Sequence, residues 1–244
     1  MNHDEGQERL TEIGTLWTVV RQAQMGSTAE ASAAQEQLWQ RYGASVRRYL
    51  HAALGNAAAA DDLMQEFALA LVQSKFRKAD PKVGRFRDYV KGVLFNLIQQ
   101  YRRRQYRRAT PLDAQEKLLE PTSYATECDQ QFRQSWRDEL LARSWAALAE
   151  AQPTFFTVLH FRAAHPDMSF EQMLQELGPQ LGKDVNAASV RQTLHRARKL
   201  FADLLLAEVA PSLDRPSVAD LQEELAELDL LPYFKAARAE SARE

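Results

Sequence analysis

The sequence has little of several features that would indicate other classes of protein. Its 244 residues include one cysteine, Cys128, so no disulfide can form within the chain and a cysteine-based metal site is not expected. No apolar run approaches the ~20 residues of a membrane span, and the first residues lack the basic-then-apolar order of a signal peptide. We therefore expect a cytoplasmic protein that makes no membrane contact.

Patterns typical of enzymes are also absent. No His/Cys cluster has the spacing of metal ligands, no glycine-rich loop could hold a phosphate, and no nucleophile and base form a recognisable pair. The histidines His51, His160 and His165 are scattered, so each is expected to be a packing or surface residue. We expect a non-enzyme without catalytic residues, cofactor or metal ion.

Glycine and proline are scarce, with nine residues of each, whereas long segments are rich in Ala, Leu, Gln, Glu and Arg. This composition predicts an all-α protein. In the amino-terminal part, apolar spacing predicts helices over about 11–54, with a turn within 24–32, then from about 58, and over about 85–108. The sequence between 109 and 129 loses this periodicity and is expected to be a linker.

The net charge of −2 hides a strong segregation of charge along the chain. Residues 75–108 contain twelve Lys and Arg against two Asp, whereas residues 214–229 contain six Asp and Glu against one Arg. The basic block predicts a polyanionic partner, and the acidic block predicts either a basic partner or an internal mimic of a polyanion.

Residues 167–207 have the pattern of a helix-turn-helix motif. A capping box at 169–172 predicts the start of a short helix, and Gly178-Pro179 is expected to end it because proline cannot donate a hydrogen bond. Asn186 can cap the next helix. In this motif the second helix enters the major groove of DNA.

The second helix of this motif has two faces of different chemistry. The face expected to be buried consists of Val190, Leu194, Ala197, Phe201 and Leu204. The opposite face and its flanks hold Ala188, Gln192, His195, Lys199, Arg191, Arg196 and Arg198. A solvated basic helix and a DNA-binding helix fit these residues equally well, and the preceding helix and turn favour DNA binding.

A second signal lies in the predicted helix AAAADDLMQEFALALVQ. Its expected buried residues are Leu63, Phe67, Ala70 and Leu71, and the opposite side holds Asp62, Gln65, Glu66 and Leu69. Acidic residues at a helix start, such as Asp61, are favoured without any function. An exposed leucine among polar residues instead indicates a protein interface, so a solvated face and an interface both remain open.

The next segment mixes aromatic and basic residues, as single-stranded nucleic-acid sites do. The residues concerned are Phe86, Arg87, Tyr89, Lys91, Asn96, Tyr101, Arg102, Arg103 and Arg104. Phe86, Val90, Leu94 and Leu97 also share a helical face, so part of the segment is expected to be core.

Three segments together resemble an extracytoplasmic-function sigma factor of bacterial RNA polymerase: ADDLMQEFALAL, then GRFRDYVKGVLFNLIQQYRRR, and a distant SVRQTLHRARKLFADLL. Their order and separation fit this family over roughly 12–207. The resemblance implies a subunit that binds RNA polymerase core and directs promoter recognition, DNA melting and transcription initiation. An anti-sigma factor or a regulatory kinase is a further partner that the resemblance allows, although no residue pattern identifies either.

The resemblance also implies roles for individual residues. Asp61, Asp62, Gln65, Glu66 and Leu69 match the helix that docks on the polymerase. Phe86, Arg87, Tyr89, Lys91, Asn96, Tyr101, Arg102, Arg103 and Arg104 match the face that melts the promoter and holds the single strand. Asn186, Ala188, Ser189, Arg191, Gln192, His195, Arg196 and Lys199 match the helix that reads the upstream promoter element.

The predicted architecture is therefore two small helical domains joined by a linker. We expect a four-helix amino-terminal domain over 1–108, a linker over 109–129, a helix-turn-helix domain over 130–207 and an acidic extension over 208–244. The turn between 178 and 186 is longer than the compact turn usual in the family, and the extension resembles one found in some environmental subgroups.

Two alternatives remain open at this point. A stand-alone helix-turn-helix regulator, which binds duplex DNA without polymerase, explains 167–207 equally well. It does not explain the polar face with Leu69 or the aromatic and basic helix of the first domain. The acidic extension either competes with DNA for the basic groove or packs its Leu221, Leu225 and Leu228 on the second domain.

Overall fold

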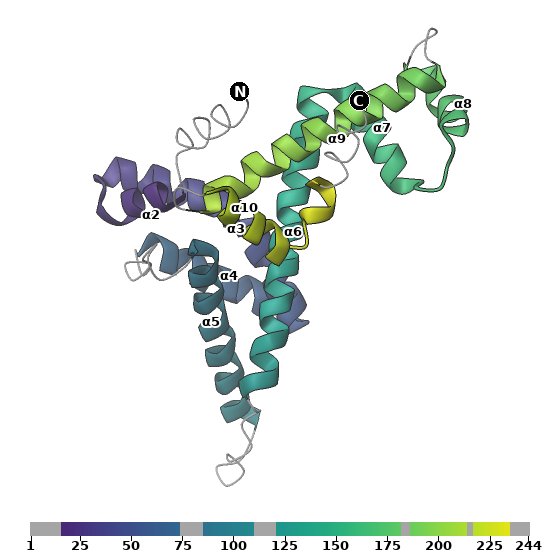
Figure 1. Cartoon of the computed structure of the whole chain (residues 1–244). Coiled ribbons are helices and arrows are strands. Elements are labelled where there is room, and N and C mark those ends of the chain that lie inside the picture. The colour runs from purple at the N-terminus through teal and green to yellow at the C-terminus, as the bar shows by residue number, and fades with distance from the viewer. Residues whose placement is uncertain (1–15, 74–84, 110–120, 182–185, 214–216, 235–244) are drawn as a thin grey trace. The chain divides into compact units, whose positions relative to one another are not determined.

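A computed structural model describes residues 16–73, 85–109, 121–181, 186–213 and 217–234 of the chain. Its elements are α2 (Leu16–Met25), α3 (Thr28–Leu54), α4 (Ala57–Val72), α5 (Phe86–Ala109), α6 (Pro121–Ala151), α7 (Pro153–Ala164), α8 (Phe170–Leu181), α9 (Ala187–Val209), the 3-10 helix η3 (Ala210–Ser212) and α10 (Val218–Glu227) (Figure 1). The described residues contain no strand, so the all-α prediction is confirmed. Within them, no helix combines the length and the apolarity needed to cross a membrane.

The chain divides into two compact units. The first unit comprises residues 1–139 with 210–220, and the second comprises residues 140–209 with 221–244. This division differs from the predicted boundary at 129/130, because α6 begins at Pro121 and continues without a break to Ala151. Part of the predicted linker is therefore helical, and its residues 110–120 lie outside the described residues.

Local capping explains where the helices of the first unit begin and end. A capping box between Ser27 and Glu30 starts α3, with the Ser27 N–H donating to the Glu30 carboxylate at 2.9 Å. Gly55 ends α3 with φ of 59°, in the left-handed region that favours glycine, and its N–H donates to the His51 carbonyl. The Asn56 side chain then accepts a hydrogen bond from the N–H of Ala59 at 3.1 Å and starts α4.

The core of the first unit is largely the predicted one. On α3, the buried residues include Leu38, Tyr42, Val46, Tyr49 and Leu50. On α4, the expected stripe of Leu63, Phe67, Ala70 and Leu71 is buried as well. On α5, Phe86, Val90, Leu94 and Ile98 are buried, whereas Leu97, which the sequence analysis placed on this face, is half-buried.

The first half of α6 adds a further helix to this core, which the predicted four-helix domain did not include. Trp136 stacks on Tyr42 with ring centroids 4.7 Å apart, and Phe132 meets Tyr49 edge-on at 5.5 Å. Each such aromatic pair adds about 0.5–1.5 kcal/mol beyond the burial of its area. Residues up to 139 therefore belong physically to the first unit rather than to a linker.

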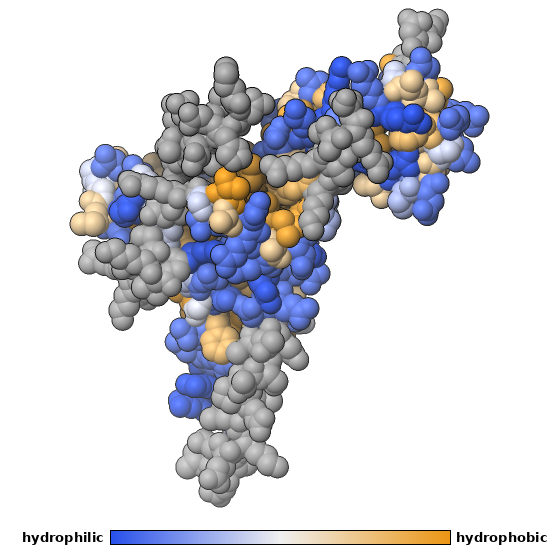
Figure 2. Space-filling model, viewed as in Figure 1, coloured by the Kyte–Doolittle hydropathy of each residue, from blue (hydrophilic) through white to orange (hydrophobic). Residues whose placement is uncertain are grey.

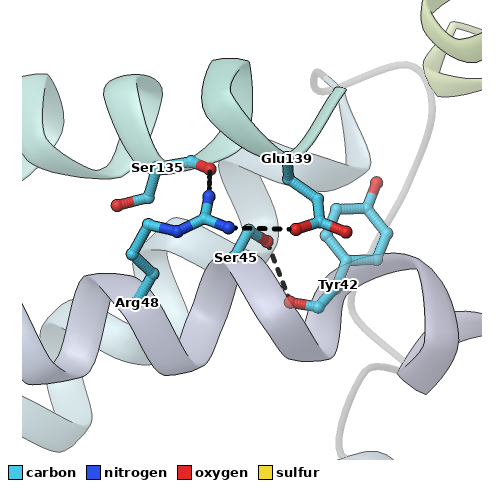
Figure 3. A network of polar contacts seen from close by, with 5 residues as sticks. All are labelled: Tyr42, Ser45, Arg48, Ser135 and Glu139. Atoms are coloured by element: carbon cyan, nitrogen blue, oxygen red, sulfur yellow. Dashed lines mark hydrogen bonds and ion pairs between the residues drawn. The ribbon is translucent and has the colours of Figure 1, made fainter. Parts of the chain in front are cut away.

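A polar network joins α3 and α6 beside these rings (Figure 3). The Arg48 guanidinium donates to the backbone carbonyl of Ser135 at 2.9 Å and to the carboxylate of Glu139 at 3.3 Å. Glu139 is buried, so the guanidinium provides the charge that its carboxylate requires. Figure 3 also shows the Ser45 hydroxyl donating to the Tyr42 carbonyl one turn earlier on α3.

In the second unit, α7, α8 and α9 pack on one another. The buried face of α9 contains Val190, Leu194, Ala197 and Phe201, as predicted, but continues through Leu205 while Leu204 is half-buried. The predicted end of the preceding helix at Gly178-Pro179 is wrong, since α8 continues to Leu181 with Pro179 inside it. Gly178 has no Cβ to clash with the proline ring, which removes part of the usual penalty.

The carboxyl-terminal segment supplies buried residues to both units. In the first unit, η3 packs against α2, and Ala210, Ser212 and Leu213 are buried. In the second unit, Leu221, Leu225 and Leu228 are buried, as expected if the acidic extension packs its leucine stripe. Glu224, one of the six acidic residues in 214–229, is also buried.

Candidate nucleic-acid and protein-binding surfaces

The exposed side of α4 carries the predicted interface residues. Asp61, Asp62 and Gln65 are exposed, Glu66 is half-buried, and Leu69 has 56% of its surface exposed. Val72, one turn after Leu69, is 60% exposed and was missed by the sequence analysis. Its position three residues after Leu69 is the signal that could have found it. Together these residues form the α4 surface, in which two apolar side chains follow an acidic helix start.

Contacts with α3 modify the charge of the α4 surface. The Asp61 carboxylate lies 3.5 Å from Arg47 and 3.9 Å from the Nε2 atom of His51. Both side chains come from the end of α3, close to the turn that caps α4. The Asp61 carboxylate therefore faces side chains of α3, whereas Asp62 lies in the centre of the α4 surface.

The structure brings the α4 surface next to the basic helix α5. Arg104 donates to the carboxylate of Glu66 at 3.0 Å, with both side chains partly exposed. One of these residues was predicted to bind polymerase and the other to bind DNA. The two predicted sites therefore meet at this ion pair.

Burial corrects the predicted DNA-binding surface at the start of α5. Phe86 is 1% exposed and lies edge-on to Trp17 at 5.8 Å and to Tyr42 at 5.3 Å. Arg87 is 2% exposed. Neither side chain offers a surface for a base or a phosphate in this structure, because Phe86 is part of the core and Arg87 is enclosed with it.

Further along α5, several predicted DNA contacts are engaged within the first unit. The Lys91 ammonium binds the carboxylate of Asp129 on α6 and lies 3.6 Å from that of Asp88. Arg102 donates to the backbone carbonyl of Ala53 at 3.1 Å. These cations therefore hold α5 against its neighbours, in addition to any role toward nucleic acid.

Tyr89 lies between the buried and the exposed parts of α5. Its ring stacks on Phe86 with centroids 6.4 Å apart, and the side chain is half-buried. Burial raises the pKa of Tyr89 above its ordinary value of 10.0. The hydroxyl is therefore protonated at neutral pH and can donate a hydrogen bond.

The exposed cations gather in the second half of α5. Gln100, Arg103, Arg104 and Arg107 line a shallow hollow on this helix. Arg107 belongs to the basic run of this segment. Gln100 was not predicted, although its spacing of three to four residues from Arg103 and Arg104 would have placed it on the same face. Of the remaining predicted residues, Asn96 is exposed and Tyr101 is half-buried. We call the four residues lining the hollow the α5 basic surface.

In the second unit, the starts of both helices of the predicted motif are capped as expected. The Ser169 N–H donates to the Gln172 side chain at 2.9 Å, and the Gln172 N–H donates to the Ser169 hydroxyl at 3.2 Å. At the start of α9, the Asn186 side chain accepts from the N–H of Ser189 at 2.8 Å, and the Asn186 N–H donates to the Ser189 hydroxyl at 2.9 Å. Asn186 and Ser189, both predicted to contact DNA, therefore shape the helix start. Residues 182–185 of the predicted turn lie outside the described residues.

The outer face of α9 exposes the other predicted residues. Ala188, Arg191, Gln192, Arg196 and Lys199 are exposed, whereas His195 is half-buried. Figure 2 shows that the visible face over α8 and the first turns of α9 is mainly hydrophilic. The Arg191 guanidinium lies over the ring of Phe170 on α8, a residue that was not among the predicted site residues. Such a helix offers hydrogen-bond donors and positive charge to a groove of duplex DNA.

No group of three or more His, Cys, Asp or Glu side chains that could hold a metal ion occurs in the described part of the chain. Cys128 is free and buried on α6.

Comparison with known proteins gave one match to a protein family. Residues 38–108, which comprise most of α3 together with α4 and nearly all of α5, match the family model for sigma-70 region 2. No curated protein and no solved structure matches the chain. The matched residues make up less than a third of the chain, and they include all residues of the α4 surface and of the α5 basic surface.

Proposed function

We propose that the protein is an alternative sigma factor of the extracytoplasmic-function type. It binds RNA polymerase core in the cytoplasm and directs promoter recognition, DNA melting and transcription initiation. The match of residues 38–108 to sigma-70 region 2 is the observation that carries this proposal. The helix-turn-helix domain lies outside the matched residues, so its part in the proposal rests on its own exposed residues.

In this proposal the α4 surface docks on the polymerase. Exposed apolar side chains beside carboxylates, as at Leu69, Val72 and Asp62, are typical of a protein interface. The α5 basic surface, which begins on the other side of the Glu66–Arg104 pair, holds the phosphates of the non-template strand.

The outer face of α9 reads the upstream element in the major groove. Arg191, Gln192 and Arg196 are exposed there, and arginine and glutamine side chains pair with guanine and adenine edges, respectively. A single base contact by either arginine is expected to contribute about 1–3 kcal/mol of discrimination.

Run-off transcription tests the proposal directly. Core polymerase is assayed with and without the protein on DNA fragments from the region upstream of its own coding sequence. Defined start sites that need both components are the expected result. If the protein binds duplex DNA tightly but does not bind core polymerase, it is instead a stand-alone helix-turn-helix regulator.

A pair of variants tests the docking surface. The double substitution Asp62→Ala and Gln65→Ala is expected to weaken core binding about tenfold or more, because both side chains lie in the centre of the α4 surface. Glu36→Ala with Gln37→Ala, which changes two exposed residues of α3, is the matched control. Equal core affinity of the two double variants would remove α4 as the docking helix.

A further inference from the structure

Two arginines of the second unit share one aromatic ring. The Cζ atom of Arg191 lies 4.8 Å from the centre of the Phe170 ring, and that of Arg162 lies 4.9 Å from the same centre. Both distances are within the ~6 Å over which a guanidinium is attracted to the face of a ring. The three residues come from three helices, since Arg162 is on α7, Phe170 on α8 and Arg191 on α9.

The ring of Phe170 is held in place by contacts that do not involve Arg191. Phe170 is the first residue of α8, directly after Ser169, which forms the capping box with Gln172. The Nη1 atom of Arg162 donates to the backbone carbonyls of Pro166 at 3.0 Å and Met168 at 2.6 Å. The turn before Phe170 and the first turn of α8 are therefore both fixed, and the half-buried ring between them has a defined position.

Arg191 has the opposite character. It is exposed on the outer face of α9, one turn after the capped start of the helix. A long exposed side chain samples many rotamers in the free protein, and fixing it against a base costs conformational entropy. A side chain that already rests on a fixed ring loses less of this entropy when DNA binds.

We propose that Phe170 is a positioning residue for DNA readout, which orients the Arg191 guanidinium toward the groove before DNA arrives. Arg162 supports this arrangement by fixing the turn that carries the ring. The inference rests on the proposed function, in which α9 reads the upstream element. It assigns part of the specificity of α9 to a residue of α8 that need not touch a base.

The test measures binding of the full-length protein with core polymerase to a promoter fragment taken from a start site found by run-off transcription. Each variant is assayed on this fragment and on one with a scrambled upstream element. Phe170→Leu, which keeps an apolar side chain but removes the ring, is expected to weaken binding to the native fragment about two- to fivefold, as for an exposed cation–π pair. Binding to the scrambled fragment is expected to stay the same. Phe170→Tyr, which restores a ring face, is expected to restore the affinity.

A matched control and a double-mutant cycle separate positioning from general damage. Phe161→Leu removes another half-buried ring of the same unit, which contacts His165 with centroids 4.6 Å apart. It is expected to leave discrimination between the two fragments unchanged. In an Arg191→Ala background, Phe170→Leu is expected to have no further effect, because the side chain that it positions is gone.

A second readout does not depend on DNA. The ring is expected to shift the side-chain proton resonances of Arg191 in the free protein, because its centre lies 4.8 Å from the Cζ atom. Phe170→Leu is expected to remove this shift, while Phe161→Leu is expected to leave it in place. If the wild-type complex does not distinguish the two fragments, the proposed function of α9 is wrong. If it does, and Arg191→Ala weakens native binding while Phe170→Leu does not, the positioning role is wrong.

Discussion

The two basic helices α5 and α9 use their cations differently. On α5, Arg87 is buried, Lys91 binds Asp129, Arg102 donates to the Ala53 carbonyl and Arg104 pairs with Glu66. On α9, the exposed cations lie on a single outer face, opposite a continuous buried face. Several basic side chains of α5 therefore bind partners within the first unit, whereas the exposed basic side chains of α9 face solvent.

This difference follows from what lies beside each helix. The carboxylates of α4 and α6 and the carbonyl at the end of α3 lie within hydrogen-bonding distance of α5, so its cations find partners within the first unit. The start of α9 lies beside α8, and the α8 side chain next to Arg191 is the aromatic ring of Phe170. A count of basic residues cannot distinguish these two cases, since the count is the same whether or not a carboxylate faces the helix.

The largest expected effect concerns Phe86, the first residue of α5, which the structure places in the core rather than on a DNA-binding surface. Phe86→Ala is expected to lower the free energy of unfolding by about 3–5 kcal/mol, because it removes a buried ring that contacts Trp17 and Tyr42. Chemical denaturation monitored by circular dichroism measures this loss. A variant with normal stability and reduced DNA binding would restore Phe86 to the DNA-binding surface.

Two arginine variants are expected to affect different properties, one the stability of the fold and the other the binding of duplex DNA. Arg87→Ala removes a side chain that is 2% exposed and is expected to cost about 1–3 kcal/mol of stability through lost packing. Arg191→Ala is expected to change the stability by less than about 1 kcal/mol, since its side chain is exposed, while weakening duplex binding. Thermal unfolding and DNA titration of both variants provide the measurement. The comparison fails if the two variants lose stability equally.

A smaller difference is expected between two cations of α5 itself. Arg103→Ala is expected to reduce the salt dependence of single-strand binding by about 0.7 in the slope of log K against log salt, as for one lost phosphate contact. Lys91→Ala is expected to leave this slope nearly unchanged, because its ammonium is already neutralised by Asp129 and Asp88. Fluorescence titrations at several salt concentrations measure both slopes. Equal decreases would show that Lys91 reaches the DNA.

The smallest effect concerns pH and is confined to α5, since α9 contains no tyrosine. Burial raises the pKa of Tyr89 in the folded protein above its unfolded value of 10.0. The neutral hydroxyl is therefore favoured by folding, and this contribution is complete below pH ~10 and is lost as the pH rises through the folded pKa. Tyr89→Phe is expected to reduce the loss of stability at alkaline pH, which thermal unfolding across that range measures. An unchanged alkaline profile would show that Tyr89 ionises without cost in the folded state.

Much of the fold could be predicted from the sequence because its helices are strongly periodic and well capped. The capping boxes at Ser27, Ser169 and Asn186 explain why three helices begin where they do. Predictions failed where two successive apolar residues could each continue a buried stripe, as at Leu204 and Leu205, which are three and four residues after Phe201. At such positions the neighbouring helix decides which side chain is buried.

The candidate sites were harder to predict, because their state depends on contacts between distant segments. Phe132 and Trp136 pair with rings of α3 that lie more than eighty residues earlier, so local periodicity could not assign the first half of α6 to the first unit. The same limit explains the burial of Arg87 and the position of Phe170 beside Arg191. Local patterns indicated which helices carry the sites but not which of their side chains are exposed.

The division of the chain has a consequence for how the protein can be dissected. The backbone passes from one unit to the other at 139/140, 209/210 and 220/221, so no single cut separates two complete halves. A fragment that ends at 129 lacks the rings of Phe132 and Trp136 and exposes their partners Tyr42 and Tyr49. It also lacks η3, which packs on α2. A soluble first unit therefore requires two stretches of chain, one reaching at least residue 139 and one supplying 210–220, joined by a linker or added as a peptide.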